Sequence, residues 1–164
     1  MTASLLVLAA AAMTAATHQP PGSQAAPQAH RDYATLNVCQ VVPGDAIARA
    51  LGGTFAEARP FGDKAFSRCT YFIVPSGGGQ RMGYVVYIQP AEDFEGLKKY
   101  IDDPITPIAG LGDGAYMFHD TGDGRFKIHV LKRGDVTIEA SGDSEASARK
   151  VAGAVVAVLW KKMP

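Results

Sequence analysis

The sequence contains little of what marks several common classes of protein. Its 164 residues include two cysteines, too few for a small scaffold built from disulfides or for a zinc site with four thiolates. Lys and Arg together number 16, as do Asp and Glu, so the chain lacks the basic excess with which nucleic-acid-binding proteins neutralise phosphates. Hydrophobic residues make up 47% and charged residues 20%, which is typical of globular proteins. We therefore expect a folded domain that binds no nucleic acid.

Motifs of common enzyme and metal chemistries are also missing. The chain has no G-x-S-x-G nucleophile elbow, no H-E-x-x-H zinc motif and no C-x-x-C redox motif. Residues 120–124 resemble the start of a calcium loop, but Gly122 and Leu131 stand where such a loop needs oxygen ligands. Turn formation explains the glycines of this segment without an ion. The sequence thus predicts no catalytic residue, no metal site and no cofactor.

Charge is missing from the N-terminal region, where no Asp, Glu, Lys or Arg precedes Arg31. Residues 3–16 form an apolar run of about 14 residues, which suits a signal peptide and is shorter than the about 20 residues that a membrane-spanning helix needs. Thr14 and Ala16 suit the −3 and −1 positions of signal peptidase. No basic residue precedes the run, so either the true start lies upstream or the signal is atypical. We predict a cleaved signal peptide over residues 1–16, a secreted or periplasmic protein, and no stable membrane span after cleavage; the alternative is a buried alanine-rich helix.

The next segment and the cysteines follow from this prediction. Residues 17–35 are rich in Pro, Gln, Ala, Gly and Ser, a composition that predicts a flexible lead-in. Outside the cytoplasm the environment is oxidising, so we predict a disulfide between Cys39 and Cys69. A free thiol pair and a metal site are the alternatives.

Residues 36–164 are predicted to form a single α+β domain, with an antiparallel sheet of about five strands and helices packed on one face. Apolar residues at helical spacing predict helices over residues 43–53, 91–102 and 144–162. Aromatic, β-branched and alternating residues predict strands at 69–75, 81–89, 115–119, 125–132 and 135–140. The segments around residues 59–61 and 102–114 are predicted loops. In the second, we expect Leu111 to be a buried anchor and Asp113 to bond local backbone amides.

The strands carry two histidines and several aromatic residues. Pairing Asp120 with Arg125 places His119 and His129 on opposite faces of the sheet, which argues against a shared metal site. Because helices cover one face, the other should expose aromatic side chains that could bind a ligand or a second copy, unless loops cover it. The candidate binding residues are Tyr71, Tyr84, Tyr87 and Tyr116.

The order of these features resembles that of small exported proteins and lipoproteins of unknown function from actinobacteria and other soil bacteria. Cys39 opens a P-x-D-A-x-x-x-x-L-G helix, Cys69 precedes an aromatic strand, and I-x-G-L-G-D-x-A-Y spans residues 108–116. A short strand pair and a terminal Ala/Val helix complete a resemblance that covers roughly residues 38–159. The extracellular sensor domain of a mycobacterial receptor kinase has a broadly similar layout.

The resemblance implies no catalytic residues. Lipid anchoring and signalling are not carried over from these proteins, since the sequence shows neither a lipobox cysteine nor a kinase segment. We therefore predict a non-enzymatic binding or accessory module of the cell envelope, with an envelope protein or a small ligand as its partner. The alternative is a small extracytoplasmic hydrolase whose site is assembled from scattered residues.

Overall fold

The computed structural model describes Tyr33 and residues 35–162, and the fold presented here is that of these residues. The predicted signal peptide over residues 1–16 lies outside them, as does most of the predicted lead-in. The helices are α1 (Val38–Val41), α2 (Gly44–Leu51), α3 (Asp93–Leu97) with the 3₁₀ turn η1 (Lys98–Tyr100), and α4 (Glu145–Lys162). The strands are β1 (Gly53–Gly62), β2 (Ser67–Pro75), β3 (Met82–Pro90), β4 (Thr106–Pro107), β5 (Gly114–Asp120), β6 (Arg125–Lys132) and β7 (Val136–Gly142).

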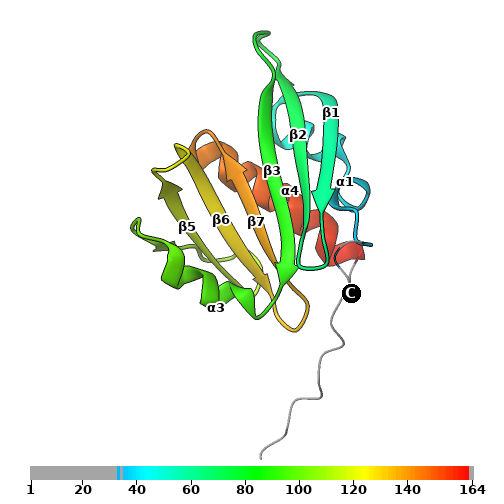
Figure 1. Ribbon diagram of the computed structural model, residues 1–164. Helices are drawn as coiled ribbons and strands as arrows, with labels where there is room; N and C mark the ends of the chain where they lie inside the picture. The colour runs from blue at the N-terminus through cyan, green and yellow to red at the C-terminus, as the bar shows by residue number, and fades with distance from the viewer. Residues whose placement is uncertain (1–32, 34, 163–164) are drawn as a thin grey trace, which may run out of the picture. The chain divides into compact units, whose positions relative to one another are not determined.

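The seven strands form one antiparallel sheet in the order β1-β2-β3-β7-β6-β5-β4 (Figure 1). Two three-stranded meanders, β1-β2-β3 and β5-β6-β7, meet where β3 pairs with β7. The α+β class and the antiparallel sheet predicted from the sequence are confirmed, with seven strands in place of about five.

The main core lies between the sheet and the helices α1, α2 and α4. α4 runs along the back of the sheet in Figure 1 and buries a stripe that includes Val151, Val155 and Leu159. α2 buries Ile47 and Ala48 and ends at Gly52, whose φ of 72° is left-handed, as expected of a glycine at a helix C-terminus. The helical spacing in the sequence therefore located both helices.

The prediction that all helices pack on one face of the sheet is wrong, because α3 packs on the other face. A second, smaller apolar cluster joins Phe94 of α3 to Tyr116 and Phe118 of β5. Along β5 these two aromatics alternate with Ala115 and Met117, which belong to the main core. Since successive side chains of a strand point to opposite faces, α3 lies on the face opposite α4. The helix predicted over residues 91–102 is thus short, and it covers only part of this second face.

The two strands at the edges of the sheet were predicted as loops. β1 contains Pro60, and β4 has two residues, the second of which is Pro107. Proline cannot donate a ladder hydrogen bond, so it is tolerated at a sheet edge and weakens the strand signal in the sequence. These strands form because β2 and β5 offer them partners, which local sequence does not reveal.

The predicted disulfide is confirmed. Cys39 of α1 and Cys69 of β2 are bonded, with their Cα atoms 5.3 Å apart. The Tyr71 hydroxyl adds a second attachment of α1 to β2, lying 2.9 Å from the carbonyl oxygen of Val42 and 3.2 Å from that of Val38. Among the described helices, none is long and apolar enough to cross a membrane.

Candidate functional site

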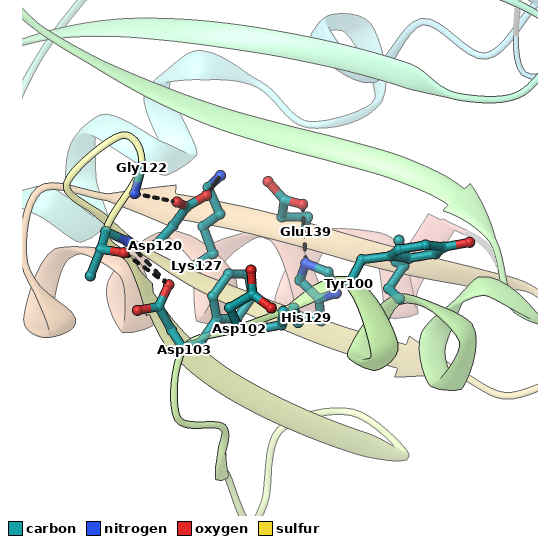
Figure 2. A pocket seen from close by; sticks show the side chains of 12 residues that line it. Tyr100, Asp102, Asp103, Asp120, Gly122, Lys127, His129 and Glu139 are labelled. Carbon is teal, nitrogen blue, oxygen red and sulfur yellow. Dashed lines mark hydrogen bonds and ion pairs between the residues drawn. The ribbon is translucent and has the colours of Figure 1, made fainter.

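A pocket of about 420 Å³ opens on the face of the sheet that α3 partly covers (Figure 2). Side chains of β5, β6 and β7 form its floor, α3 and η1 form one wall, and the segment after η1 meets the β5–β6 turn at its rim. Its lining residues are Leu97, Tyr100, Ile101, Asp102, Asp103, Phe118, Asp120, Thr121, Gly122, Lys127, His129 and Glu139. Such a volume suits a small molecule.

His129 is the most deeply buried polar group of the floor, with 2% of its surface exposed. Its Nε2 lies 3.0 Å from Oε2 of Glu139 on β7, the residue directly across the strand pair. Its Nδ1 lies 2.7 Å from the hydroxyl of Tyr116, which also lies 3.2 Å from the carbonyl oxygen of Phe94. Burial is the main cause that raises the pKa of Tyr116 above its ordinary value, and the nearby Glu139 carboxylate adds to it. Both imidazole nitrogens are therefore occupied by partners within the fold.

Lys127 also lies in the floor, and it is held between two carboxylates. Its Nζ forms ion pairs with Asp120 and, at 3.0 Å, with Asp123 of the β5–β6 turn. Burial lowers the pKa of Lys127, but the hydrogen bonds to both aspartates outweigh it, so the pKa is raised overall. The hydrogen bond from Lys127 is the main cause that lowers the pKa of Asp120. Lys127 is thus a charged structural centre, and its charge is compensated within the turn.

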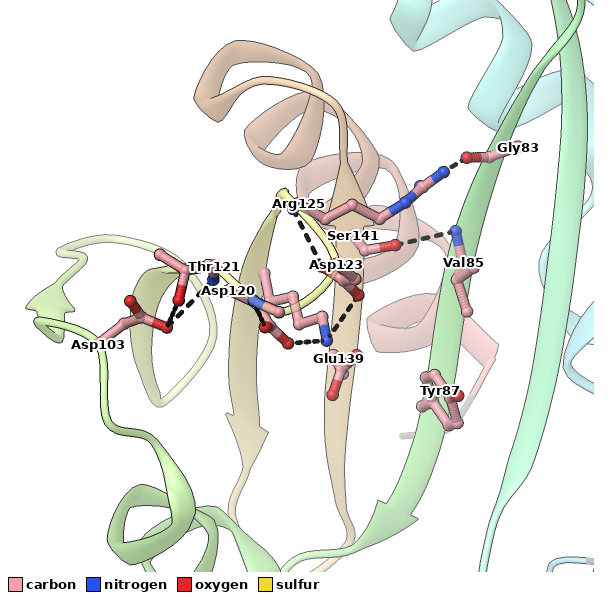
Figure 3. Close-up of polar contacts among 12 residues, drawn as sticks. Gly83, Val85, Tyr87, Asp103, Asp120, Thr121, Asp123, Arg125, Glu139 and Ser141 are labelled. Atoms are coloured by element: carbon pink, nitrogen blue, oxygen red, sulfur yellow. Dashed lines mark hydrogen bonds and ion pairs between the residues drawn. The ribbon is translucent and has the colours of Figure 1, made fainter.

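Hydrogen bonds at the rim of the pocket connect two segments that are separated in the sequence. Oδ2 of Asp103 accepts a hydrogen bond from the backbone N–H of Thr121 at 3.2 Å, which ties the segment after η1 to the β5–β6 turn (Figure 3). Oδ1 of Asp120 accepts one from the N–H of Gly122 at 2.9 Å. Tyr100 stands at the rim with 75% of its surface exposed, the more exposed of two large hydrophobic residues that are open to solvent among the described residues.

The neighbouring part of the sheet is also held by side chains (Figure 3). β3 pairs with β7 only from Val86 onward, so the preceding residues of β3 lack a backbone partner on that side. Ser141 Oγ accepts a hydrogen bond from the N–H of Val85 at 3.3 Å, and the Arg125 guanidinium donates to the carbonyl oxygen of Gly83 at 2.7 Å. These contacts join the two meanders beside the pocket floor.

The four tyrosines predicted as a binding face do not share one surface. Tyr71 and Tyr84 point into the main core, with 0% and 7% of their surfaces exposed, because helices cover that side of β2 and β3. Tyr116 lies on the opposite face but is buried beneath α3. Tyr87 alone is half-buried on the uncovered face, where the Arg68 guanidinium donates to its hydroxyl at 3.2 Å. The prediction that these four tyrosines form one binding face is therefore wrong.

The predicted register of the histidine hairpin is confirmed. Asp120 pairs with Arg125, so His119 lies opposite Phe126 and His129 opposite Tyr116, on different faces of the sheet. His119 is exposed and stacks on Phe126, with ring centroids 4.6 Å apart. Within the described part of the chain, no group of three or more His, Cys, Asp and Glu residues could hold a metal ion.

The prediction for the glycine-rich loop is correct in part. Leu111 is half-buried and packs against the main core, which is less burial than predicted. Asp113 does not bond a local amide, and its Oδ2 instead accepts from the N–H of Arg133, 20 residues away at the β6–β7 turn, at 2.8 Å. The loop is therefore attached to a neighbouring turn by a long-range contact that its own sequence does not reveal.

Sequence reasoning missed the residues that build the pocket floor. The predicted β6–β7 hairpin contained the signal for one pair, since extending its register places His129 directly opposite Glu139. No pattern in the local sequence indicates that η1 and the segment after it line the same pocket as Lys127. Comparisons with known proteins assign no family: no family model matches the chain, and neither a curated protein nor a solved structure is significantly similar to it.

Proposed function

We propose that this protein is an exported, non-enzymatic binding module of the cell envelope and that its ligand occupies the pocket beside α3. The observation that carries the proposal is a pocket of small-molecule size whose polar floor is preorganised by contacts within the fold. The Cys39–Cys69 disulfide supports export, because such bonds persist in oxidising compartments.

The state of the floor residues favours binding over catalysis. A general base needs a nitrogen or oxygen that faces the proton it removes. His129 has partners at both nitrogens, and Lys127 is paired with two carboxylates, so neither side chain is poised to attack a substrate. A floor with fixed charges and fixed hydrogen bonds instead offers a rigid surface on which a ligand can be oriented.

The lining indicates which ligands fit. The carboxylates of Asp102, Asp103 and Glu139 offer acceptor oxygens, whereas Leu97 and Phe118 contribute apolar surface and Tyr100 an exposed ring at the rim. Acceptors combined with an aromatic ring favour a small molecule that is rich in hydroxyl or amine donors. We expect the pocket to prefer a protonated amino sugar over the neutral sugar, and the neutral sugar over the corresponding acid.

The experiment is a titration of the ¹⁵N-labelled protein, followed by NMR, with glucosamine, glucose and gluconate. Glucosamine should shift the amides of Thr121 and Gly122 most strongly, and Tyr100→Ala should weaken its binding. Phe61→Ala is the matched control, because Phe61 is also an exposed large hydrophobic residue and lies on β1, outside the pocket.

Two results would contradict this proposal. One is equal, weak shifts for all three probes that Tyr100→Ala does not change, since the pocket would then have no selectivity for its ligand. The other is turnover of a chromogenic ester at a rate that Glu139→Gln abolishes while the protein stays folded. That second result would support the alternative, a small hydrolase.

A further inference from the structure

A second hollow lies in the helical layer, on the side of the sheet opposite the α3 pocket. It is a groove of about 410 Å³ between α2 and α4. Its floor consists of small apolar side chains, namely Pro43, Ala46, Ala154, Ala157 and Val158. Arg49, Lys161 and Lys162 complete the lining, and among the described residues no carboxylate lines it. The groove thus combines an apolar floor with charge of one sign.

The cations stand apart along the groove. Lys162 Nζ donates to the carbonyl oxygen of Val41 at 2.8 Å, so the end of α4 lies beside the start of α2. The backbone of Arg49 lies six residues beyond Pro43 along α2, a rise of about 9 Å at 1.5 Å per residue, so Arg49 and Lys162 attach to the backbone at different points along the groove. A chain-like apolar ligand lying on the floor would therefore reach a cation in either orientation.

Two of these cations are available to a ligand. Arg49 and Lys161 are exposed, and neither forms an ion pair with another described residue. Several other cations of the fold are compensated, among them Arg149, which pairs with Glu145 at 2.9 Å, and Lys127, which pairs with Asp120 and Asp123. What sets Arg49 and Lys161 apart from other exposed cations such as Lys150 is that they line an apolar groove.

We propose that the groove between α2 and α4 binds a single anionic amphiphile, an alkyl chain with a carboxylate head group. The chain would cover the alanine and valine floor and remove apolar surface from water, which favours binding. The carboxylate would accept hydrogen bonds from Arg49 or from Lys161, and no acidic side chain in the lining repels it. The site is separate from the α3 pocket and extends the proposed function with a second ligand class.

The test uses the folded protein and octanoate, titrated below its micelle concentration and followed by NMR. Octanoate should shift the amides of Ala46, Ala154 and Ala157. Octyl glucoside, which has a neutral head group and a chain longer by one methylene, should still bind more weakly, and octyltrimethylammonium weakest of all. Butanoate should bind at least ten-fold more weakly than octanoate, because each methylene removed costs about two-fold in affinity even when half of it is buried.

Variants separate the two parts of the proposed site. Lys161→Gln should weaken octanoate binding by up to about five-fold, the upper end of what an exposed ion pair contributes. Ala157→Glu places a carboxylate on the floor and should abolish binding, while the exposure of Ala157 leaves the fold intact. Lys150→Gln is the matched control, since Lys150 is an exposed cation of α4 that does not line the groove.

Three results would overturn the proposal: equal binding of octanoate and octyl glucoside, binding that Ala157→Glu leaves unchanged, and protein that binds vesicles of anionic phospholipid but not monomeric octanoate. None of them bears on the α3 pocket, because the readout for that pocket is the glucosamine shift at Thr121 and Gly122. Failure of one proposal is thus distinguishable from failure of the other.

Discussion

The disulfide between Cys39 and Cys69 should account for a large part of the stability of the folded domain. The bond closes a loop of about 31 residues, and the chain-entropy relation assigns such a loop about 3.7 kcal/mol at 25 °C. The roughly 130 residues from Tyr33 to Lys162 have an unfolding entropy of about 0.27 kcal/mol/K. Loss of the bond should therefore lower the Tm by about 14 °C.

The structure indicates that this loss acts mainly through the unfolded chain. When the bond is removed, α1 remains attached to β2, because the Tyr71 hydroxyl still contacts the carbonyl oxygens of Val38 and Val42. Cys39→Ala, Cys69→Ala and the double variant all free the same loop. They should lower the Tm by similar amounts, as should reduction of the native protein, with a small extra loss for Cys69, which is fully buried.

Differential scanning calorimetry, with mass spectrometry of the alkylated protein, checks this prediction. The native protein should resist alkylation until it is reduced. Two alkylatable thiols in the native protein would refute the bond itself. A Tm that falls by less than about 3 °C on reduction would refute the loop-entropy argument, since less than about 1 kcal/mol would then depend on the bond.

Two further predictions concern backbone strain and charge. In urea unfolding, Gly112→Ala should destabilise the fold by at least about 1 kcal/mol more than Gly110→Ala. Both glycines have a positive φ, so both substitutions strain the backbone. Only at Gly112 would the new Cβ also lie 2.8 Å from a backbone oxygen of β6. Equal losses would contradict this. The second prediction follows from the lowered pKa of Asp120 in the folded protein. The ionised carboxylate stabilises the fold at pH values above its ordinary pKa of about 4, and this stabilisation is lost as the pH falls through the lower folded-state pKa. Lys127→Gln should weaken the dependence of the free energy of unfolding on pH below about pH 4. If this dependence is unchanged in the variant, the Asp120–Lys127 ion pair contributes nothing to stability.

The sequence by itself determined the features that repeat over short distances. Side-chain alternation and the turn at residues 121–124 predicted the β5–β6 register correctly, including the opposite faces of His119 and His129. Helical spacing located α2 and α4, and the cysteines were paired by number and compartment. Each of these rests on periodicity, on turn chemistry or on redox chemistry, which act without knowledge of the distant chain.

The tertiary structure decided which of these features came together. β1 and β4 are strands because β2 and β5 offer them hydrogen-bond partners, although their prolines weaken the local signal. Tyr116 is buried because α3 crosses to the face opposite α4, which alternation along β5 cannot predict. Both candidate ligand sites are lined by elements that are separated in the sequence: η1 and β5–β7 line the α3 pocket, and α2 and α4 line the groove. Such sites depend on long-range packing, and a local pattern contains no information about which element will pack against it.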